Sequence, residues 1–368
     1  MALFLLFKQG QDRSCTCEGR KYSMPSTLRS LLFLLALVLP AIPADNNLPN
    51  AAKSGVANLG HGAKAILWRD PKDIPSLNLR YGVGGEEHQP RGTFTFVQED
   101  MEGSNPKLDV RDQDGVKWKV KMGAEARPEV VASRLVWAAG YFTTEDYFLE
   151  ELHVQGLPSH LHRGQDQVGP DGTIHNVRLK RALKGQEKVG TWQWASNPFV
   201  STREFNGLRV LMALINNWDL KDSNNAIYQA KHDDGSGDLE QTYLISDLGA
   251  SFGTSGFTLS MDASRGNLGE YKHSKFISSK NDDYVDFAAP GRPTLIESFN
   301  LPVFVHRIDL RWIGKHIARG DAKWLGQVLG QLSPDQLRDA FRAAGYSPQD
   351  ADEFASVVQA RIAELNAL

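Results

Sequence analysis

Cysteine is nearly absent from this chain of 368 residues, which contains only Cys15 and Cys17. Both lie in an N-terminal segment that we expect to be removed, so the remaining chain has no thiol. This excludes disulfide bonds, thiolate metal sites and a cysteine nucleophile from the mature protein. The sequence also lacks internal repeats and low-complexity tracts.

An excess of basic residues is also missing. The chain carries 41 Lys and Arg against 44 Asp and Glu, a formal net charge of −3. Removing residues 1–44 takes away five basic and two acidic side chains, which changes the formal charge to −6. Proteins that bind nucleic acid usually present a basic face, so the composition argues against a nucleic-acid partner.

Residues 1–44 have the pattern of a cleavable secretory signal peptide. Basic residues precede an apolar core, residues 31–44, that ends in small side chains. The core is shorter than the roughly 20 apolar residues of a transmembrane helix, so we expect no membrane span after cleavage. The sequence therefore predicts cleavage near Ala44 and a periplasmic, secreted or secretory-pathway location.

Two further expectations concern the same end of the chain. Met24 is an alternative start, because residues 24–44 alone form a compact signal peptide. Residues 45–65 are polar and rich in Ala, Gly and Asn, which predicts a flexible leader.

The most informative motif is Asn217-Trp218-Asp219-Leu220-Lys221-Asp222-Ser223-Asn224, which is followed by Ser246-Asp247-Leu248-Gly249. An aspartate, an asparagine five residues later, and an aspartate ahead of a glycine hold ATP and its metal ions in kinases. Asp219 is the candidate for accepting the proton of an attacking hydroxyl. Asn224 and Asp247 offer the hard oxygen ligands that Mg²⁺ or Mn²⁺ prefers.

The surroundings of this motif support the interpretation. Apolar residues recur at helical spacing from Phe205 to Ile215, which predicts a buried amphipathic helix ahead of the loop. Residues 226–228 and 242–246 predict two short strands around a polar turn. Helix, loop, hairpin and metal-binding aspartate is an order typical of the catalytic half of a kinase.

The N-terminal half supplies a strand that carries lysines. Residues 94–97 and 108–111 predict two strands, and residues 112–115 predict a tight turn into a third strand, residues 116–121. Alternation along the third strand puts three apolar side chains on one face and three lysines on the other. These lysines are Lys117, Lys119 and Lys121.

A helix predicted over residues 129–140 supplies a glutamate partner for this strand. In kinases a strand lysine contacts the α and β phosphates, and a glutamate of the next helix holds it. We therefore pair Lys121 with Glu129. Lys119, on the same face of the strand, and Glu125, ahead of the helix, are the alternates.

Taken in order, these motifs resemble those of atypical kinases. The turn at residues 102–107, the strand at 118–121 and the helix at 129–135 look like the N-lobe of HipA-type kinases. The N-x-D-x-x-x-x-N loop at 217–224 and the D-x-G at 247–249 resemble those enzymes and the phosphatidylinositol 3- and 4-kinases. They are also similar to the secretory-pathway Golgi casein kinases.

The resemblance implies an α+β, bilobal protein-kinase-like fold with ATP between the lobes. The small β-rich N-lobe would span residues 66–155, and the larger helical C-lobe would span residues 156–368. Residues 146–157 would connect the lobes. An insertion, expected as a hairpin, would cover residues 157–184.

The resemblance also implies which residues contact the phosphates of ATP. Lys121 would hold them, with Lys119 as the alternate, and Glu129 would orient Lys121. The turn at residues 103–107, with Ser104 and Lys107, would cover the phosphates, as glycine-bearing turns with exposed backbone N–H groups do for anions.

Catalysis and metal binding are implied for the second motif. Asp219 would be the catalytic aspartate, and Lys221 would contact the transferred phosphoryl group. Asn224 and Asp247 would bind the metal. The motif departs from protein kinases at Trp218, where they have arginine, at Leu248, where they have phenylalanine, and in having no G-x-G-x-x-G loop.

The sequence thus predicts a phosphotransferase that uses ATP and Mg²⁺ or Mn²⁺ to modify a hydroxyl of a protein, sugar or lipid headgroup. One alternative is an exported pseudokinase-type module that only binds nucleotide or protein. A complete set of metal and phosphate ligands argues against it. Another is transfer of AMP on the same fold, with ATP bound in the reverse orientation.

Overall fold

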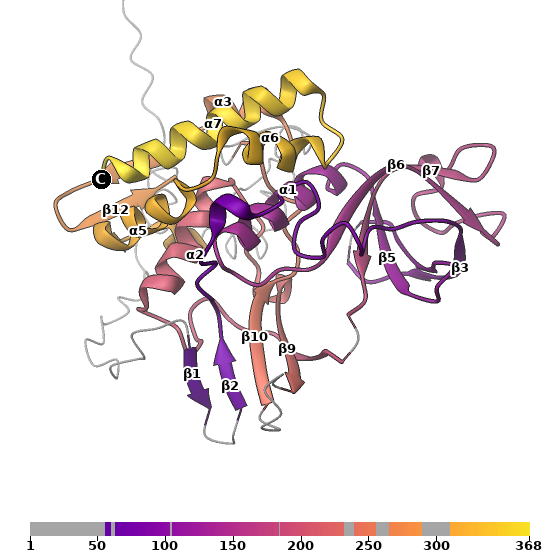
Figure 1. The fold of residues 1–368 in the computed structure, drawn as a ribbon, viewed down its shortest axis with the longest axis horizontal. Coiled ribbons are helices and arrows are strands. Elements are labelled where there is room, and N and C mark those ends of the chain that lie inside the picture. The colour runs from indigo at the N-terminus through magenta and orange to yellow at the C-terminus, as the bar shows by residue number, and fades with distance from the viewer. Residues whose placement is uncertain are drawn as a thin grey trace, which may run out of the picture. The chain divides into compact units, whose positions relative to one another are not determined.

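The computed structural model of this protein describes residues 56–59, 63–103, 105–183, 185–231, 239–254, 265–288 and 310–368. These residues belong to one compact unit, Asn50–Leu368. They contain both helices and strands, as the sequence predicts (Figure 1). These elements surround two hydrophobic cores. The expected signal peptide, residues 1–44, lies outside the described residues.

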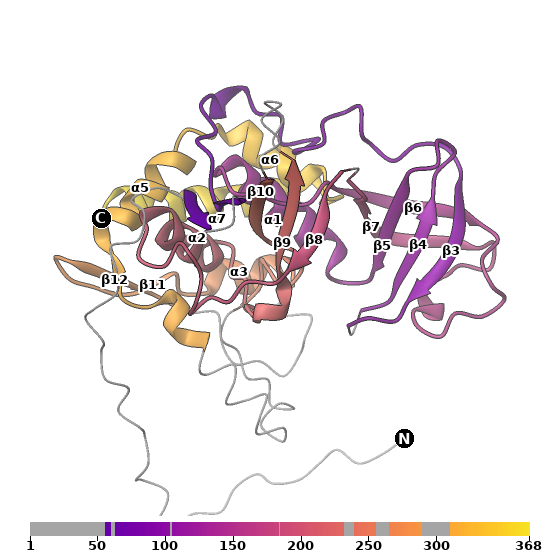
Figure 2. The ribbon, with the colours of Figure 1, turned by 90° about the horizontal axis from the view of Figure 1, so that it is seen from below.

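Five strands close into a barrel around the smaller core (Figure 2). They are β3 (Phe94–Asp100), β4 (Lys107–Arg111), β5 (Lys117–Met122), β6 (Asp146–Gln155) and β7 (Thr173–Arg181). Their order around the barrel is β3-β4-β5-β7-β6, and only β3 with β6 is a parallel pair. Trp118 and Val120 of β5 pack in the barrel core, so the lysines of β5 lie on its outer face.

Helix α1 (Ala126–Ala138) connects β5 to β6 and contacts both β6 and β7. It belongs to the larger core through side chains such as Val130 and Leu135. Gly140 follows it with φ +89°, and a Cβ at this position would lie 2.3 Å from the Arg69 carbonyl oxygen. Only glycine lets the chain turn here against residue 69.

A second sheet contributes residues such as Tyr243 and Ile245 to the larger core. Its strands are β1 (Val56–Leu59), β2 (Ala63–Ile66), β8 (Glu187–Gly190), β9 (Asn225–Lys231) and β10 (Leu239–Ile245), in the order β1-β2-β10-β9-β8. The expected flexible leader, residues 45–65, is therefore wrong in its last part. β2 pairs in parallel with β10, and this distant partner stabilises a segment whose composition alone suggests a loop.

Helices and a small sheet complete the larger core. The helices are α2 (Arg203–Leu214), α3 (Leu268–His273), α5 (Arg319–Leu329), α6 (Pro334–Arg342) and α7 (Pro348–Asn366). The sheet contains β11 (Ile277–Lys280), β12 (Tyr284–Phe287) and β13 (Ile317–Ala318). Ser333 and Ser347 cap α6 and α7, as their position ahead of proline predicts. Within the described chain, no helix is both long and apolar enough to cross a membrane.

The expected boundary between the two parts of the chain needs correction. Residues 146–157, predicted as a connection, contain strand β6, and the predicted insertion at 157–184 contributes β7 to the barrel. Residues 66–79, predicted in the β-rich part, pack in the larger core through Leu67, Ile74 and Leu79. The glycine and proline residues between β6 and β7 suggest an inserted hairpin, but they belong to the long turn of a barrel hairpin.

Candidate active site

Lys121 lies at the centre of a charged cluster between the barrel and the second sheet. Its ammonium is 2.9 Å from Glu129 Oε2, 3.2 Å from Glu125 Oε2 and 3.0 Å from Asp247 Oδ1. The Lys121 side chain is only 4% exposed. Lys121 is the penultimate residue of β5, Glu125 and Glu129 lie at the N-cap and in the first turn of α1, and Asp247 lies two residues after β10. One lysine therefore joins three elements, the last of them 126 residues away in sequence.

A second cation holds the glutamate of α1. Arg178 of β7, directly opposite Lys121 in the sheet, places its Nη2 2.8 Å from Glu129 Oε1. Its Nε is 3.7 Å from Asp146 Oδ1, and both residues are buried. Glu129 is thus fixed between Lys121 and Arg178, and it presents one oxygen to each. This arrangement fixes the glutamate before any ligand arrives.

The charges in this cluster change one another's pKa. Burial alone would lower the pKa of Lys121, but the carboxylates of Glu129 and Asp247 raise it above its ordinary value. Burial alone would raise the pKa of Asp247, but Lys121 lowers it to about 2. Burial raises the pKa of Glu125, against the opposing effect of Lys121. At neutral pH, Lys121 is therefore a cation and Asp247 a carboxylate.

The loop from Asn216 to Asn224 is held by its own backbone contacts. The backbone N–H of Asn217 donates to the Met212 carbonyl in α2, at 2.9 Å, and the Asn217 side chain accepts from the Asp219 N–H, at 3.1 Å. The N–H of Trp218 donates to the Ala250 carbonyl, at 3.2 Å. These bonds tie the loop to the segment that follows Asp247.

Asp219 and Lys221 contact each other in this loop. The Lys221 ammonium lies 2.9 Å from Asp219 Oδ1, and the side chains are 37% and 22% exposed respectively. Asn224 Nδ2 donates to the Asp219 carbonyl at 2.6 Å. This bond holds the Asn224 amide against the loop backbone through its nitrogen.

Asn224 and Asp247 are brought together by the second sheet. Ser246, next to Asp247, donates to the Asn224 carbonyl through its backbone N–H at 2.7 Å and its hydroxyl at 3.0 Å. Within the described chain, neither Asn224 Oδ1 nor Asp247 Oδ2 accepts a hydrogen bond. Two hard oxygen atoms are thus available to a cation such as Mg²⁺ or Mn²⁺.

Protein groups alone do not complete a metal site here. Among the described residues, no group of three or more His, Cys, Asp or Glu side chains is arranged to hold a metal ion. This fits a magnesium-type site, because Mg²⁺ is usually bound by one or two protein ligands together with water and substrate phosphates. The Asn224 and Asp247 oxygens fit that donor set.

Two lysines expected near the phosphates, Lys119 and Lys107, pair with Asp100 and not with the carboxylates around Lys121. Lys119 places its ammonium 2.5 Å from Asp100, and Lys107 lies 3.7 Å from the same carboxylate. Ser104 lies outside the described residues. Asp100 ends β3, so both lysines are held on the outer face of the barrel beside the turn at residues 101–106.

Arg178, Asp146 and Arg265 are site residues that the sequence motifs do not indicate. Arg178 lies between the apolar residues Val177 and Leu179, an alternation typical of a strand. The sequence nevertheless predicts an insertion over this segment, so the alternation alone did not indicate a site residue. Arg265 approaches Glu125 at 2.8 Å, and no local pattern indicates this contact, because 140 residues separate the two.

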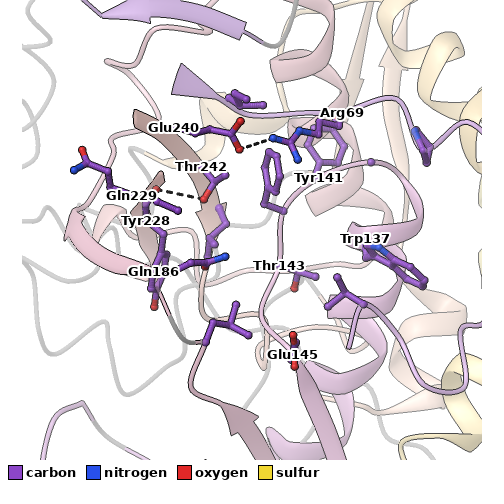
Figure 3. A pocket seen from close by; sticks show the side chains of 18 of the residues that line it. Arg69, Trp137, Tyr141, Thr143, Glu145, Gln186, Tyr228, Gln229, Glu240 and Thr242 are labelled. Atoms are coloured by element: carbon purple, nitrogen blue, oxygen red, sulfur yellow. Dashed lines mark hydrogen bonds and ion pairs between the residues drawn. The ribbon is translucent and has the colours of Figure 1, made fainter. Parts of the chain in front are cut away.

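A cavity of about 1400 Å³ is lined by other residues (Figure 3). Its lining comes from Trp137 of α1, residues 140–143 and 145 after that helix, Leu183, Gly185 and Gln186 between β7 and β8, and strands β9 and β10. Arg69 and Glu240 form an ion pair at its edge. None of the residues discussed above as phosphate, metal or catalytic groups lines it.

Comparison with known proteins gives weak similarities to solved kinase structures. No protein-family model matches this chain, and no curated protein matches it. The Helicobacter pylori proinflammatory kinase CtkA is 11% identical, with a TM-score of 0.38, covering 76% of this chain and 94% of its own.

The Golgi casein kinase is also similar, at 10% identity and a TM-score of 0.33, covering 81% of this chain and 77% of its own. Its structure with Mn/ADP bound gives 10% identity and a TM-score of 0.34, covering 81% of this chain and 76% of its own. At sequence identities of 10–11% and TM-scores below 0.5, these similarities carry no argument for function. Such an argument must rest on the residues and distances described above.

Proposed function

We propose that this protein is an ATP-dependent phosphotransferase with a bilobal, protein-kinase-like fold. The observation that carries the proposal is the contact between Lys121 and Asp247, 3.0 Å apart, which joins the lysine strand to the motif aspartate. Glu129 completes the lysine pair, and Asp219 and Asn224 lie on the loop that β10 holds. The barrel would be the N-lobe, and the larger core would form the C-lobe.

Each residue would have a distinct task in transfer. Lys121, positioned by Glu129, would neutralise charge on the phosphates, and Asn224 and Asp247 would hold Mg²⁺ or Mn²⁺. The metal ion supplies electrostatic stabilisation of the phosphoryl group when bound. Asp219 would orient the acceptor hydroxyl and take its proton.

The transfer step forms one bond to phosphorus and breaks another. A bond forms between the acceptor oxygen and the γ phosphorus, and the bond between the γ phosphorus and the bridging oxygen of ADP breaks. The hydroxyl proton passes to Asp219, and ADP leaves with the electron pair. Lys221, 2.9 Å from Asp219, would contact the transferred group.

Nucleotide binding requires Lys121 to give up one of its carboxylate contacts. In the structure its ammonium contacts three carboxylates, so a phosphate must take the place of one of them. Asp247 is the carboxylate that a metal ion would occupy, and its side chain is 37% exposed, whereas both glutamates are buried. We infer that metal and phosphate exchange for the Lys121–Asp247 contact together.

Calorimetric titration of ADP in the presence of Mn²⁺ tests the proposal. The parent protein should bind with a metal-dependent signal that EDTA abolishes, and Lys121→Met should lose most of the affinity. Lys117→Met is the matched control, since Lys117 lies on the same face of the same strand but pairs with Asp109 at 2.9 Å. Equal binding by parent and Lys121→Met would contradict the assigned site.

The extracytoplasmic location remains part of the proposal. It depends on cleavage after Ala44, and Edman sequencing of the purified protein should start at Asp45. A protein that retains residues 1–44 in the cytoplasm would contradict the location and leave the proposed chemistry intact.

A further inference from the structure

Arg265 supplies a cation beside the loop residue at which the motif departs from protein kinases. Its guanidinium carbon lies 5.3 Å from the centre of the Trp218 ring, within the range of a cation–π contact. Trp218 is 2% exposed and directly precedes Asp219. Arg265 is held beside it partly by the next residue, since the Gly266 N–H donates to the Ser251 carbonyl at 2.8 Å.

The same arginine binds Glu125, which was only an alternate partner of Lys121 in the sequence. Arg265 Nε is 2.8 Å from Glu125 Oε1, and the two side chains are 16% and 7% exposed. Glu125 Oε2 accepts from Asn105 at 2.7 Å and lies 3.2 Å from the Lys121 ammonium. Each oxygen of Glu125 thus faces a cation, one from the barrel and one from the segment after Asp247.

The backbone next to Asp247 is shaped around this glutamate. A Cβ built on Gly249 would lie 2.6 Å from the Glu125 Cβ, closer than real carbon atoms approach. The glycine of the D-x-G motif therefore lets the start of α1 pack against the motif backbone. This packing holds the backbone of Glu125 beside the motif that carries Asp247.

We propose that Arg265 is a positioning residue that holds Glu125, so that Lys121 is able to bind the phosphates of the nucleotide. This inference rests on the proposed function. With Arg265 in place, the charge of Glu125 is balanced without Lys121. Without Arg265, Lys121 becomes the only cation within 4 Å of Glu125 among the described residues, and the lysine is drawn away from an incoming nucleotide.

The other carboxylates around Glu125 also make the loss of Arg265 unfavourable for nucleotide binding. Asp247 and Glu129 both contact Lys121, at 3.0 and 2.9 Å, and both add negative charge near Glu125. Loss of Arg265 would therefore leave an excess negative charge where a polyanionic ligand must bind. Such a charge reduces affinity for the nucleotide by about tenfold.

Three variants test this role: Arg265→Gln, Glu125→Gln, and the two combined. Arg265→Gln should weaken Mn²⁺-dependent ADP binding about tenfold, and Glu125→Gln should remain within about threefold of the parent. The double variant should recover to within about threefold, because the carboxylate that competes for Lys121 is gone. A purely structural role predicts the opposite, since the stacking of Arg265 on Trp218 is still missing in the double variant.

Two further variants keep the test informative. Arg265→Lys retains the charge and should stay within about threefold of the parent, even if Arg265→Gln folds poorly. Arg203→Gln is the matched control, because Arg203 lies 4.7 Å from the ring centre of Trp324 and 3.1 Å from Glu204, away from the cluster. It should leave ADP affinity unchanged.

The outcomes separate this inference from the proposed function. If the parent binds ADP with Mn²⁺ and the double variant binds as weakly as Arg265→Gln, the positioning role is overturned and the proposed function stands. If the parent binds no nucleotide with Mn²⁺ or Mg²⁺, the proposed function is overturned, and the positioning role with it. Recovery in the double variant supports both.

Discussion

Replacing Asp247 with asparagine separates the two tasks of this side chain. In the structure Asp247 pairs with Lys121 at 3.0 Å, and in the proposed function it also binds metal. Asparagine has nearly the same shape and keeps one oxygen, but it has no charge. The variant should therefore fold, because Lys121 retains Glu125 and Glu129, whereas metal-dependent nucleotide binding should be lost.

The cost to stability can be worked out from the pKa of Asp247. Burial would raise this pKa, but Lys121 lowers it from the ordinary 3.8 to about 2. At about 1.36 kcal/mol per pKa unit, that change corresponds to about 2.4 kcal/mol of unfolding free energy. Since 37% of the side chain is exposed, solvent screening reduces the expected loss to about 1 kcal/mol.

The direction in which stability changes with pH follows from the lowered pKa of Asp247. The stabilisation is fully present above the ordinary carboxyl pKa near 4 and is lost as the pH falls through about 2. Parent and Asp247→Asn should therefore differ by about 1 kcal/mol at pH 7 and converge toward pH 2. Asp286→Asn is the control, since Asp286 pairs with Lys315 at 3.6 Å with 33% exposure and lies outside the cluster.

Ligand-dependent stability gives the decisive comparison. Mn²⁺ with ADP at about one hundred times its Kd should stabilise the parent by about 2.7 kcal/mol. Asp247→Asn should gain less than about 0.5 kcal/mol under the same conditions, because a hard charged ligand is missing. Urea unfolding followed by tryptophan fluorescence measures both values. Equal stabilisation of parent and variant would refute the metal role of Asp247.

Four other substitutions test neighbouring residues. Lys121→Met should lower the unfolding free energy by about 3 kcal/mol at pH 7 in urea titrations, because each buried glutamate loses a cation; a loss below about 1 kcal/mol would show that the cluster is not buried as described. Asp219→Ala should keep ATP affinity within about threefold and slow transfer by about 10²- to 10⁴-fold. Asn224→Ala should instead lower the metal-dependent affinity for ATP. If both substitutions lower this affinity equally, Asp219 is a metal ligand. Gly249→Ala should destabilise by about 2 kcal/mol, since its Cβ would meet Glu125 at 2.6 Å, and an unchanged melting temperature would contradict that packing.

The parts of the site that the sequence could predict are those whose residues lie close together along the chain. The loop from Asp219 to Asn224 and the pairing of Lys121 with Glu129 depend on residues within one loop or on a strand and the next helix. Local patterns carry this information, because alternation on a strand and spacing on a helix decide which side chains share a face. Glu125, the alternate partner that the sequence offers, also contacts Lys121, so both glutamates pair with this lysine.

The parts that could not be predicted depend on distant partners. β2 lies in a segment with loop composition and forms a strand because it pairs with β10, more than 170 residues later. β7 was assigned to an insertion because the turn before it is long and rich in glycine. Arg265 reaches Glu125 and Trp218 only through the fold. Tertiary pairing decided these elements, and local composition did not.

The central claim is that the cluster around Lys121 and Asp247 transfers the γ-phosphoryl group of ATP. The most direct measurement is chromatography of the nucleotide products after the protein, lacking residues 1–44, is incubated with ATP and Mn²⁺. The account predicts ADP, formed by the parent and not by Lys121→Met or Asp219→Ala, with water or a protein hydroxyl as acceptor. Formation of AMP, or no turnover by a parent that also binds no nucleotide, would contradict it.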